Sequence, residues 1–383
     1  MWNFDSSLSS IVKPYRFSIV KWEARTIPHE VREWIFGRHE KVDNEVGTVM
    51  EYFSLVDQAK ALKSEIEAIN AGSGQGNLAS LEAELNRVEK QRMALEDAVE
   101  KIISKQIKEI LAEQGIFNPL VGLKVHFPPL SFTLEKTPYL LVISPRDRIE
   151  SIREITLRQN LSLEEMEDIE DRVDKLGVSS LVVKLGGFGG TYPAFVVNDA
   201  SLRFTLDTAT EEWLHQYLVF KPLGFLYLLD LIGVSRNYDI ATMNETVASM
   251  VSKEIGAMVY EKYYSQYEGD EKQSQGAESE FDFNREMREI RKVVDEYLAQ
   301  GEIEQAEEFM EQKRQFLASR GYHIRKLNQA YFAFHGTYAD KPTSISPIGA
   351  EMKKLRDQSA SLKDFLETAA AMTSRQDLVE SIK

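Results

Sequence analysis

The chain has 383 residues, with 43% hydrophobic and 28% charged residues, as in ordinary soluble globular proteins, and a formal net charge of −15 at pH 7. This acidic balance argues against nucleic acid as a main partner, because phosphate binding needs clusters of Lys and Arg. The absence of Cys excludes disulfides and thiolate metal ligands. The length predicts two or three domains.

Neither a signal peptide nor a membrane span is predicted. The first 21 residues lack an apolar core of the kind found in signal peptides. The most apolar stretch, residues 217–234, is interrupted by Lys221, Pro222, Gly224 and Asp230, whereas a span takes ~20 nearly uninterrupted apolar residues. We therefore expect a buried helix and turn there and a chain that is soluble as given, with the cellular compartment left open.

Residues 28–114 predict an antiparallel helical hairpin. Apolar residues recur at spacings of three and four in both arms, as in a coiled-coil seam. Residues 71–77, which contain three Gly, predict the turn between the arms. The seam comprises Leu55, Ala59, Leu62, Ile66 and Ile69 in the first arm and Leu78, Leu81, Leu85, Val88, Leu95, Val99 and Ile102 in the second, with Arg92 as its one gap.

Residues 116–206 predict a small mixed α/β unit. Short β-branched or aromatic runs at residues 139–144, 180–184 and 194–198 indicate strands. Ser162 and Glu165 have the spacing of a capping box at the start of a helix between them. The segment Gly186 to Gly190 does not fit a dinucleotide-binding loop and is interpreted as a flexible turn.

The remaining chain is predicted to be helical again. Residues 207–267 carry helices broken around residues 221–239, residues 268–282 are a polar, acidic linker or loop, and the rest predicts four or five helices with a loop at residues 340–347. The predicted fold class is α+β and mostly helical. Its divisions are an N-terminal segment with the hairpin (1–115), a domain with the strands and candidate site (116–267), the linker (268–282) and a helical subdomain (283–383).

Residues 211–215, Glu-Glu-Trp-Leu-His, differ at one position from the His-Glu-x-x-His motif of zinc metallopeptidases. In that motif the two His lie on one face of a helix and bind Zn²⁺, and the Glu is the general base. Glu212 stands at the position of the base and His215 at that of the second ligand. Glu211 stands at the position of the first ligand.

A second helix is predicted to supply a third ligand. The sequence Asn-Glu-Thr-Val-Ala begins at Asn244, so that Glu245 is the candidate. We expect the first helix to begin near Thr208 and the second near Thr242. We also expect Glu212, His215 and Glu245 to converge within the radius of one metal site, with the side-chain tips of His215 and Glu245 roughly 3–4 Å apart. The alternative is that Glu211 and Glu245 only cap these helices, since Thr208 and Thr242 each stand three residues before one of them.

These residues resemble the gluzincins, metallopeptidases with HExxH on one helix and an Asn-Glu motif on a following helix. The run from Leu327 to Asp340 is similar to a C-terminal motif of predicted bacterial membrane-anchored peptidases of this kind. The resemblance implies a zincin-like domain, bound Zn²⁺, a peptide or protein substrate, and an association with membranes through a segment absent from this chain. It also implies that residues 189–197 form the edge strand to which a substrate adds.

The same resemblance implies a donor that stabilises the oxyanion. The candidates are Tyr331, His335 and Tyr338, and His335 is favoured because His or Tyr fills this role in related enzymes. The other four His, at positions 29, 39, 126 and 323, are interpreted as structural.

Glu211 makes the metal site unusual. A carboxylate can replace His as a ligand, but the extra charge and hard oxygen favour Zn²⁺ less and Mn²⁺ more. The sequence therefore leaves three functions open. They are a zinc-dependent peptidase weakened or inactivated by Glu211, a pseudoenzyme that binds peptides or proteins through its cleft and hairpin, and a coiled-coil adaptor. Bound metal distinguishes the first from the others.

Overall fold

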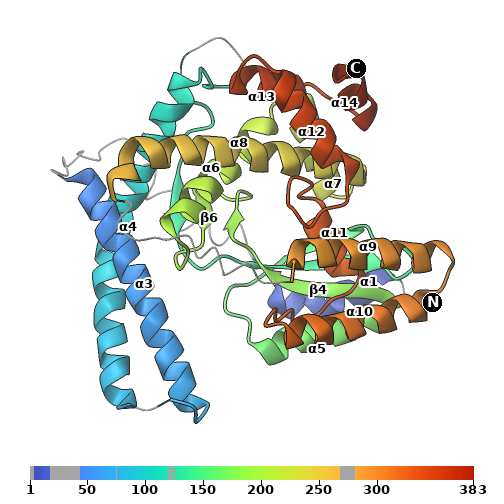
Figure 1. Cartoon of the computed structure of the whole chain (residues 1–383), viewed down its shortest axis with the longest axis horizontal. Helices are drawn as coiled ribbons and strands as arrows, with labels where there is room; N and C mark the ends of the chain where they lie inside the picture. Colours follow the sequence, from blue (N-terminus) through green and yellow to red (C-terminus); the bar gives the residue numbers. More distant parts are fainter. Residues whose placement is uncertain (1–3, 18–43, 75, 120–123, 125, 268–280) are drawn as a thin grey trace.

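A computed structural model of the chain describes residues 4–17, 44–74, 76–119, 124, 126–267 and 281–383 (Figure 1). Helices make up most of these residues. In chain order they are α1 (Phe4–Val12), α3 (Glu45–Asn70), α4 (Leu78–Glu113), α5 (Leu163–Asp174), α6 (Leu202–Leu218), α7 (Pro222–Leu231), α8 (Tyr238–Tyr264), α9 (Phe283–Ala299), α10 (Ile303–Ser319), α11 (Gln329–Gly336), α12 (Pro347–Gln358), α13 (Leu362–Ala370) and α14 (Arg375–Ser381). The short 3-10 helices η1 (Lys13–Tyr15) and η2 (Ser265–Tyr267) extend α1 and α8.

The strands of the described residues form two sheets of three strands each. They are β1 (Phe132–Leu134), β2 (Tyr139–Pro145), β3 (Arg153–Leu157), β4 (Val178–Lys184), β5 (Gly187–Phe188) and β6 (Ala194–Val196). One sheet is antiparallel, with the order β3-β2-β4; in the other, with the order β1-β6-β5, β6 pairs parallel to β1 and antiparallel to β5. The mostly helical α+β class is thus confirmed, as are the three predicted strands.

The predicted edge strand is in the wrong place. Residues 189–197 were expected to form an edge, but β6 lies in the middle of its sheet because β1, about 60 residues earlier, pairs with it. The edges of this sheet among the described strands are β1 and β5. The turn expected from Gly186 to Gly190 is present only in part: residues 189 and 190 form a turn, whereas Gly187 and Phe188 pair with Val196 and Phe195 of β6.

The helices α3 and α4 form a hairpin that projects from the rest of the protein (Figure 1). Its outer part has a small apolar cluster of Leu55, Ala59 and Val88, against which Leu85 and Leu95 pack. Gly72 has a φ of +76° in the turn between the arms, a conformation that Gly adopts without strain. Regular coiled-coil packing along the whole seam remains a prediction, and residues 28–43 of the predicted first arm lie outside the described residues.

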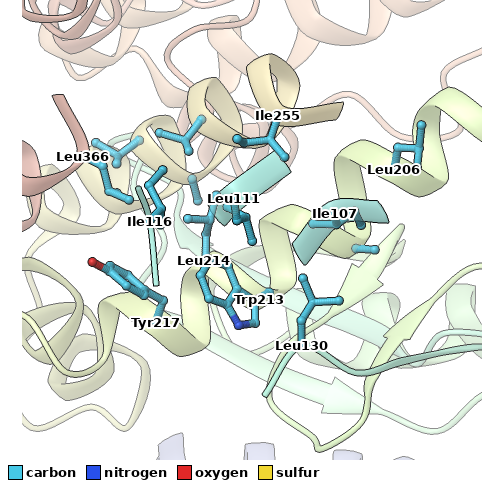
Figure 2. Packing of buried hydrophobic residues seen from close by; sticks show 14 of the residues in the cluster. Ile107, Leu111, Ile116, Leu130, Leu206, Trp213, Leu214, Tyr217, Ile255 and Leu366 are labelled. Carbon is cyan, nitrogen blue, oxygen red and sulfur yellow. The ribbon is translucent and has the colours of Figure 1, made fainter. Parts of the chain in front are cut away.

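Arg92, the gap in the apolar seam, attaches the hairpin to the body. It is 9% exposed and donates a hydrogen bond to the main-chain carbonyl of Asn198, which follows β6. Its guanidinium also lies over the ring of Tyr52 on α3, 6.0 Å from the ring centroid. Toward its C-terminal end, α4 enters the main core, where Ile107 and Leu111 pack with residues of α6 and α8 (Figure 2). The core therefore crosses the predicted boundary at residue 115, and the domain boundaries remain predictions.

The C-terminal region, residues 283–383, has six helices rather than four or five. The short helix α11 and the capped final helix α14 account for the difference, because segments of seven or eight residues give a weak periodic signal. The predicted loop at residues 340–347 is present up to the start of α12 at Pro347. Most of the predicted acidic linker, residues 268–280, lies outside the described residues. None of the helices in the described ranges combines the length and the apolar character needed to cross a bilayer.

Two predicted local features have opposite outcomes. The capping box of α5 is confirmed, since Ser162 Oγ accepts a hydrogen bond from Glu165 N at 3.1 Å and Glu165 Oε2 accepts one from Ser162 N at 3.0 Å. The helices of the candidate site, however, begin earlier than expected. Ser201 caps α6 and Asn237 caps α8, so Thr208 and Thr242 lie within helices. Glu211 and Glu245 are therefore not capping residues, and the capping alternative is wrong.

At the outer edge of β1, a buried carboxyl group accepts a main-chain hydrogen bond that a neighbouring strand would otherwise accept. Glu100 Oε1 accepts hydrogen bonds from Leu134 N at 2.6 Å and from Thr133 Oγ1 at 3.2 Å. Burial raises the pKa of Glu100 to about 8. Because the folded protein holds this proton more tightly than the unfolded chain does, stability falls as the pH rises from about 4.5 to about 8.

Glu100→Gln is expected to reduce this loss of stability. The amide oxygen can still accept the two hydrogen bonds, but it carries no charge to desolvate at high pH. The variant and the wild type should have the same free energy of unfolding at pH 5. At pH 9 the free energy of unfolding of the variant should be about 1–3 kcal/mol higher, since one unit of pKa shift corresponds to about 1.4 kcal/mol. Urea denaturation at both pH values measures the difference. A gap that is the same at both pH values would contradict the explanation.

Candidate metal centre

The amphipathic helix α6 presents the candidate residues on one face because its other face is fixed in the core. Trp213, Leu214 and Tyr217 are buried and pack among residues of α4 and α8 (Figure 2). Trp213 Nε1 also donates a hydrogen bond to Pro128 O at 2.7 Å, which fixes the rotation of the helix. Glu211 and His215 are one turn apart and therefore share the opposite face.

The packing of α6 on α8 brings together the three predicted ligands. One donor atom from each of Glu211, His215 and Glu245 lies within 4.8 Å of the other two. His215 Nε2 and Glu245 Oε2 are 3.6 Å apart, and two donors bonded to one ion at about 2.1 Å are at most about 4.2 Å apart. The predicted convergence of His215 and Glu245 is thus confirmed, although 29 residues separate them in sequence. Glu211, rather than the expected Glu212, is the third member of the converging group.

Asn244 orients the imidazole of His215. Its Oδ1 is 3.0 Å from His215 Nδ1. Since a carbonyl oxygen only accepts, a hydrogen resides on Nδ1, and Nε2 is the ring nitrogen that faces Glu245. Metal-binding His residues are oriented in this way by a partner on the second ring nitrogen. The Asn of the Asn-Glu motif therefore has a function of its own.

The carboxylates of the cluster have oxygens that no hydrogen bond satisfies. In the described part of the chain, Glu211 Oε1 and Glu245 Oε2 are buried without a hydrogen-bond partner. Tyr227 of α7 donates to Glu245 Oε1, which leaves Oε2 directed toward His215. Unpartnered buried carboxylate oxygens are costly. A cation between them would remove that cost, so the residues fit a metal ion.

The side chains of the cluster have raised pKa values without a cation. Burial raises the pKa of Glu211 to about 7, and the nearby Glu245 raises it further. Burial also raises the pKa of Glu212 to about 8, with Glu211 and Glu245 adding to the effect. Burial lowers the pKa of His215, but the three carboxylates more than offset this, so that its pKa is raised. Without a cation the cluster retains protons, and a divalent ion would displace them.

Glu212 lies against the edge strand β5. A Cβ atom added at Gly187 would be 2.2 Å from Glu212 Oε1, and one at Gly189 would be 2.8 Å from Glu212 Oε2. Only Gly permits this approach. The backbone N–H of Gly189 also donates a hydrogen bond to the Glu212 carboxylate. Gln216, one residue after His215, donates to the carbonyls of Gly189 and Thr191 at 3.2 and 3.0 Å. The predicted base and the edge strand are thus held together.

The C-terminal motif reaches the site along α8. Thr246, directly after Glu245, donates from Oγ1 to Thr337 O at 3.4 Å and accepts from Ala339 N at 3.1 Å. One turn later, Ser249 donates to Asp340 Oδ2 at 2.9 Å. These bonds hold Tyr338 beside the carboxylates. Burial, followed by Glu245, Glu211 and Glu212, raises the pKa of Tyr338 far above its ordinary value.

His335 has a different environment from Tyr338. Its ring packs on those of Tyr331 and Phe334, with centroids 4.3 and 5.1 Å apart. Burial and then the nearby Lys341 lower its pKa to about 4, so it is neutral at pH 7. The carboxylates of the cluster raise the pKa of Tyr338, which places this side chain near them. Tyr338 is therefore a better candidate for the oxyanion donor than His335, which the sequence favoured.

Two residues of the site were not predicted from the sequence. Tyr227, the partner of Glu245, lies in the apolar stretch that was interpreted only as a buried helix. Lys341 follows the C-terminal motif directly. Burial lowers the pKa of Lys341, and the nearby carboxylates of Glu211 and Asp340 partly offset this effect. Lys341 therefore lies close enough to Glu211 to contribute positive charge there. In the sequence, Tyr227 is only a hydroxyl group in an apolar helix and Lys341 only a cation beside a motif. Neither feature specifically indicates a site residue.

Comparisons of the chain with family models, with curated proteins and with solved structures found no match. The residues of the site and their geometry are therefore the basis for inferring a function.

Proposed function

We propose that this protein is a metal-dependent peptidase of the gluzincin type, in which Glu211, His215 and Glu245 bind one divalent cation. The observation that carries the proposal is the pair of unpartnered carboxylate oxygens, Glu211 Oε1 and Glu245 Oε2, that converge with the Nε2 of an oriented His215. A purely structural cluster of two Glu and a His would be expected to satisfy these oxygens with donors from the protein.

The cation is proposed to be Zn²⁺ or a harder ion such as Mn²⁺. The donor set has two carboxylates and one imidazole, which favours harder ions more than the two His of the intact motif do. When bound, such an ion acidifies a water molecule and polarises the scissile carbonyl. The second carboxylate on the α6 face, Glu212, remains free to act on the substrate.

The chain's own groups supply proton transfer and positioning. Glu212 takes a proton from the attacking water and returns it to the leaving amine, and the N–H of Gly189 holds its carboxylate in place. Tyr338 donates a hydrogen bond to the oxyanion. Its high pKa keeps it protonated for that role.

The substrate is proposed to be a peptide in extended form. The strand β5 is one of the two edges of its sheet among the described strands, and it is the edge that lies next to Glu212. A peptide paired with this edge would present a main-chain carbonyl beside the base. The zincin-like domain fold, the coiled-coil nature of the hairpin and the membrane association implied by the resemblance belong to the same proposal.

The second candidate is a pseudoenzyme that binds peptides without cleaving them. Glu211 favours it, because a carboxylate in place of the first His weakens Zn²⁺ binding, and its pKa of about 7 leaves it partly protonated at neutral pH. In that protein β5 and the hairpin would provide the binding surface.

Hydrolysis of a quenched fluorescent peptide library tests the proposal. Protein stripped with a chelator should be inactive and should regain activity with Zn²⁺, Mn²⁺ or Co²⁺, whereas His215→Ala should remain inactive with each ion. Metal that binds to the cluster without any hydrolysis would favour the pseudoenzyme. Hydrolysis that survives chelation and His215→Ala would overturn both the metal-dependent peptidase and the pseudoenzyme.

A further inference from the structure

A basic groove separates the hairpin from the sheets of this acidic protein. Its volume is about 560 Å³, within the range of about 300–1,000 Å³ that is typical of ligand sites. The lining comes from α3, α4, the connection before β2, the segment before α5, the end of β4 and the segment after β6. Its charged residues are Lys60, Lys63, Arg92, Lys136 and Lys184, with only two carboxylates, Glu89 and Asp199.

The positive charge of this groove is only partly neutralised. Five cations against two carboxylates give a net charge of +3, in a chain whose net charge is −15. Lys63 pairs with Glu89 at 2.7 Å and Lys184 with Asp199 at 3.2 Å. Arg92 pairs at 3.8 Å with Glu96, a carboxylate of α4 outside the lining. Lys136, by contrast, donates to the neutral Asn160 Oδ1 at 2.9 Å, and the structure shows no ionic partner for Lys60 within the described ranges. Both ammonium groups are therefore available to an anionic ligand.

The groove adjoins the edge strand at which the proposed substrate binds. Lys184 is the last residue of β4, and β5 begins three residues later at Gly187. Three extended residues span roughly 10 Å. On the other side, Asn198 and Asp199 lead from β6 directly into the N-cap of α6, Ser201. A peptide paired with β5 would thus direct one of its ends toward the groove.

We propose that this groove is an exosite for an acidic segment of the polypeptide substrate, located a few residues from the bond that is cleaved. The inference rests on the proposed function for the nature of its ligand. Charge complementarity selects the occupant, because Asp and Glu side chains pair with Lys60 and Lys136 and a neutral segment gains nothing there. The overall charge of −15 repels an acidic peptide elsewhere on the surface, so the groove determines both affinity and the position of the substrate.

The test uses two labelled peptides that differ only in one flank, four Glu in one and four Gln in the other. Binding is measured by fluorescence anisotropy with chelator present, which makes the readout independent of catalysis. The acidic peptide should bind at least about 10-fold more tightly than the neutral one, and added NaCl should remove the difference. The double variant Lys60→Glu/Lys136→Glu should lose this preference. Because both side chains are exposed, folding should be unaffected, which circular dichroism checks.

The matched control is Lys354→Glu/Lys175→Glu, which makes the same change of charge at exposed positions outside the groove and should retain the preference. Equal binding of the two peptides, or equal loss in the control variant, would overturn the exosite. Tighter binding of a single-stranded oligonucleotide of the same charge would also overturn it. Preferential binding of the acidic peptide together with a complete lack of metal-dependent hydrolysis would support the groove and contradict the peptidase instead.

Discussion

Glu212→Gln is expected to lower the rate of metal-dependent peptide hydrolysis by about 10²–10⁴-fold, the usual contribution of a general base. The amide has the size of the carboxylate and can still accept the hydrogen bond from Gly189, but it cannot take a proton from water. Because Glu212 is not among the three converging ligands, the affinity for the cation should change by less than about threefold. Steady-state kinetics with saturating metal and a titration of the same variant measure the two quantities.

The adjacent residue supplies the matched control. Glu211→Gln makes the same chemical change one position earlier, but it removes a proposed ligand rather than the base. It should weaken metal binding by at least about 10-fold, because an amide oxygen is a poorer ligand than a carboxylate. If both substitutions affect binding and turnover alike, the division of roles between Glu211 and Glu212 is wrong.

Glu211→His is expected to raise the affinity for Zn²⁺ by about 10²-fold or more, equivalent to about 2.7 kcal/mol. The substitution rebuilds His-Glu-x-x-His on the face of α6, and Glu245 already provides the third ligand. It also removes a buried carboxylate that contributes to the raised pKa of Glu212. Peptidase activity with Zn²⁺ should therefore appear or increase.

Selectivity provides an internal control for this variant. Replacing a hard oxygen by an imidazole should raise the affinity for Zn²⁺ far more than that for Mn²⁺. Competition titrations with a chromophoric chelator give both values. If the Glu211→His variant binds Zn²⁺ no more tightly than the wild type, residue 211 does not face the ion. If the variant gains activity, adding Glu212→Gln to it should abolish that activity.

The ligands could be predicted in part from local geometry and in part from the resemblance to the gluzincins. Glu211 and His215 are one helical turn apart, and the Asn-Glu motif indicated that Glu245 lies on a partner helix. The starts of these helices could not be predicted from Thr208 and Thr242, because Ser201 and Asn237 cap them earlier and the helices continue through both Thr. A pattern of four residues does not show which of two possible caps the chain uses.

The predictions that were wrong, and the site residues that were not predicted, involve contacts between segments distant in sequence. The pairing of β1 with β6 joins residues 132–134 to 194–196 and places β6 between β1 and β5, which no local pattern reveals. The relation of Tyr338 to the carboxylates depends on hydrogen bonds from Thr246 to the segment after α11. Tyr227 and Lys341 likewise acquire their importance only from the groups that the fold places beside them.

The most direct test of the central claim is a calorimetric titration of metal-free protein with Zn²⁺ and with Mn²⁺, in parallel with His215→Ala and Glu245→Gln. Binding of one ion per chain is expected for the wild type, and a loss of at least about 10-fold in affinity for each variant, because each lacks one of the converging ligands. Absence of saturable binding, or equal binding by the wild type and both variants, would contradict the proposal that Glu211, His215 and Glu245 form a metal site.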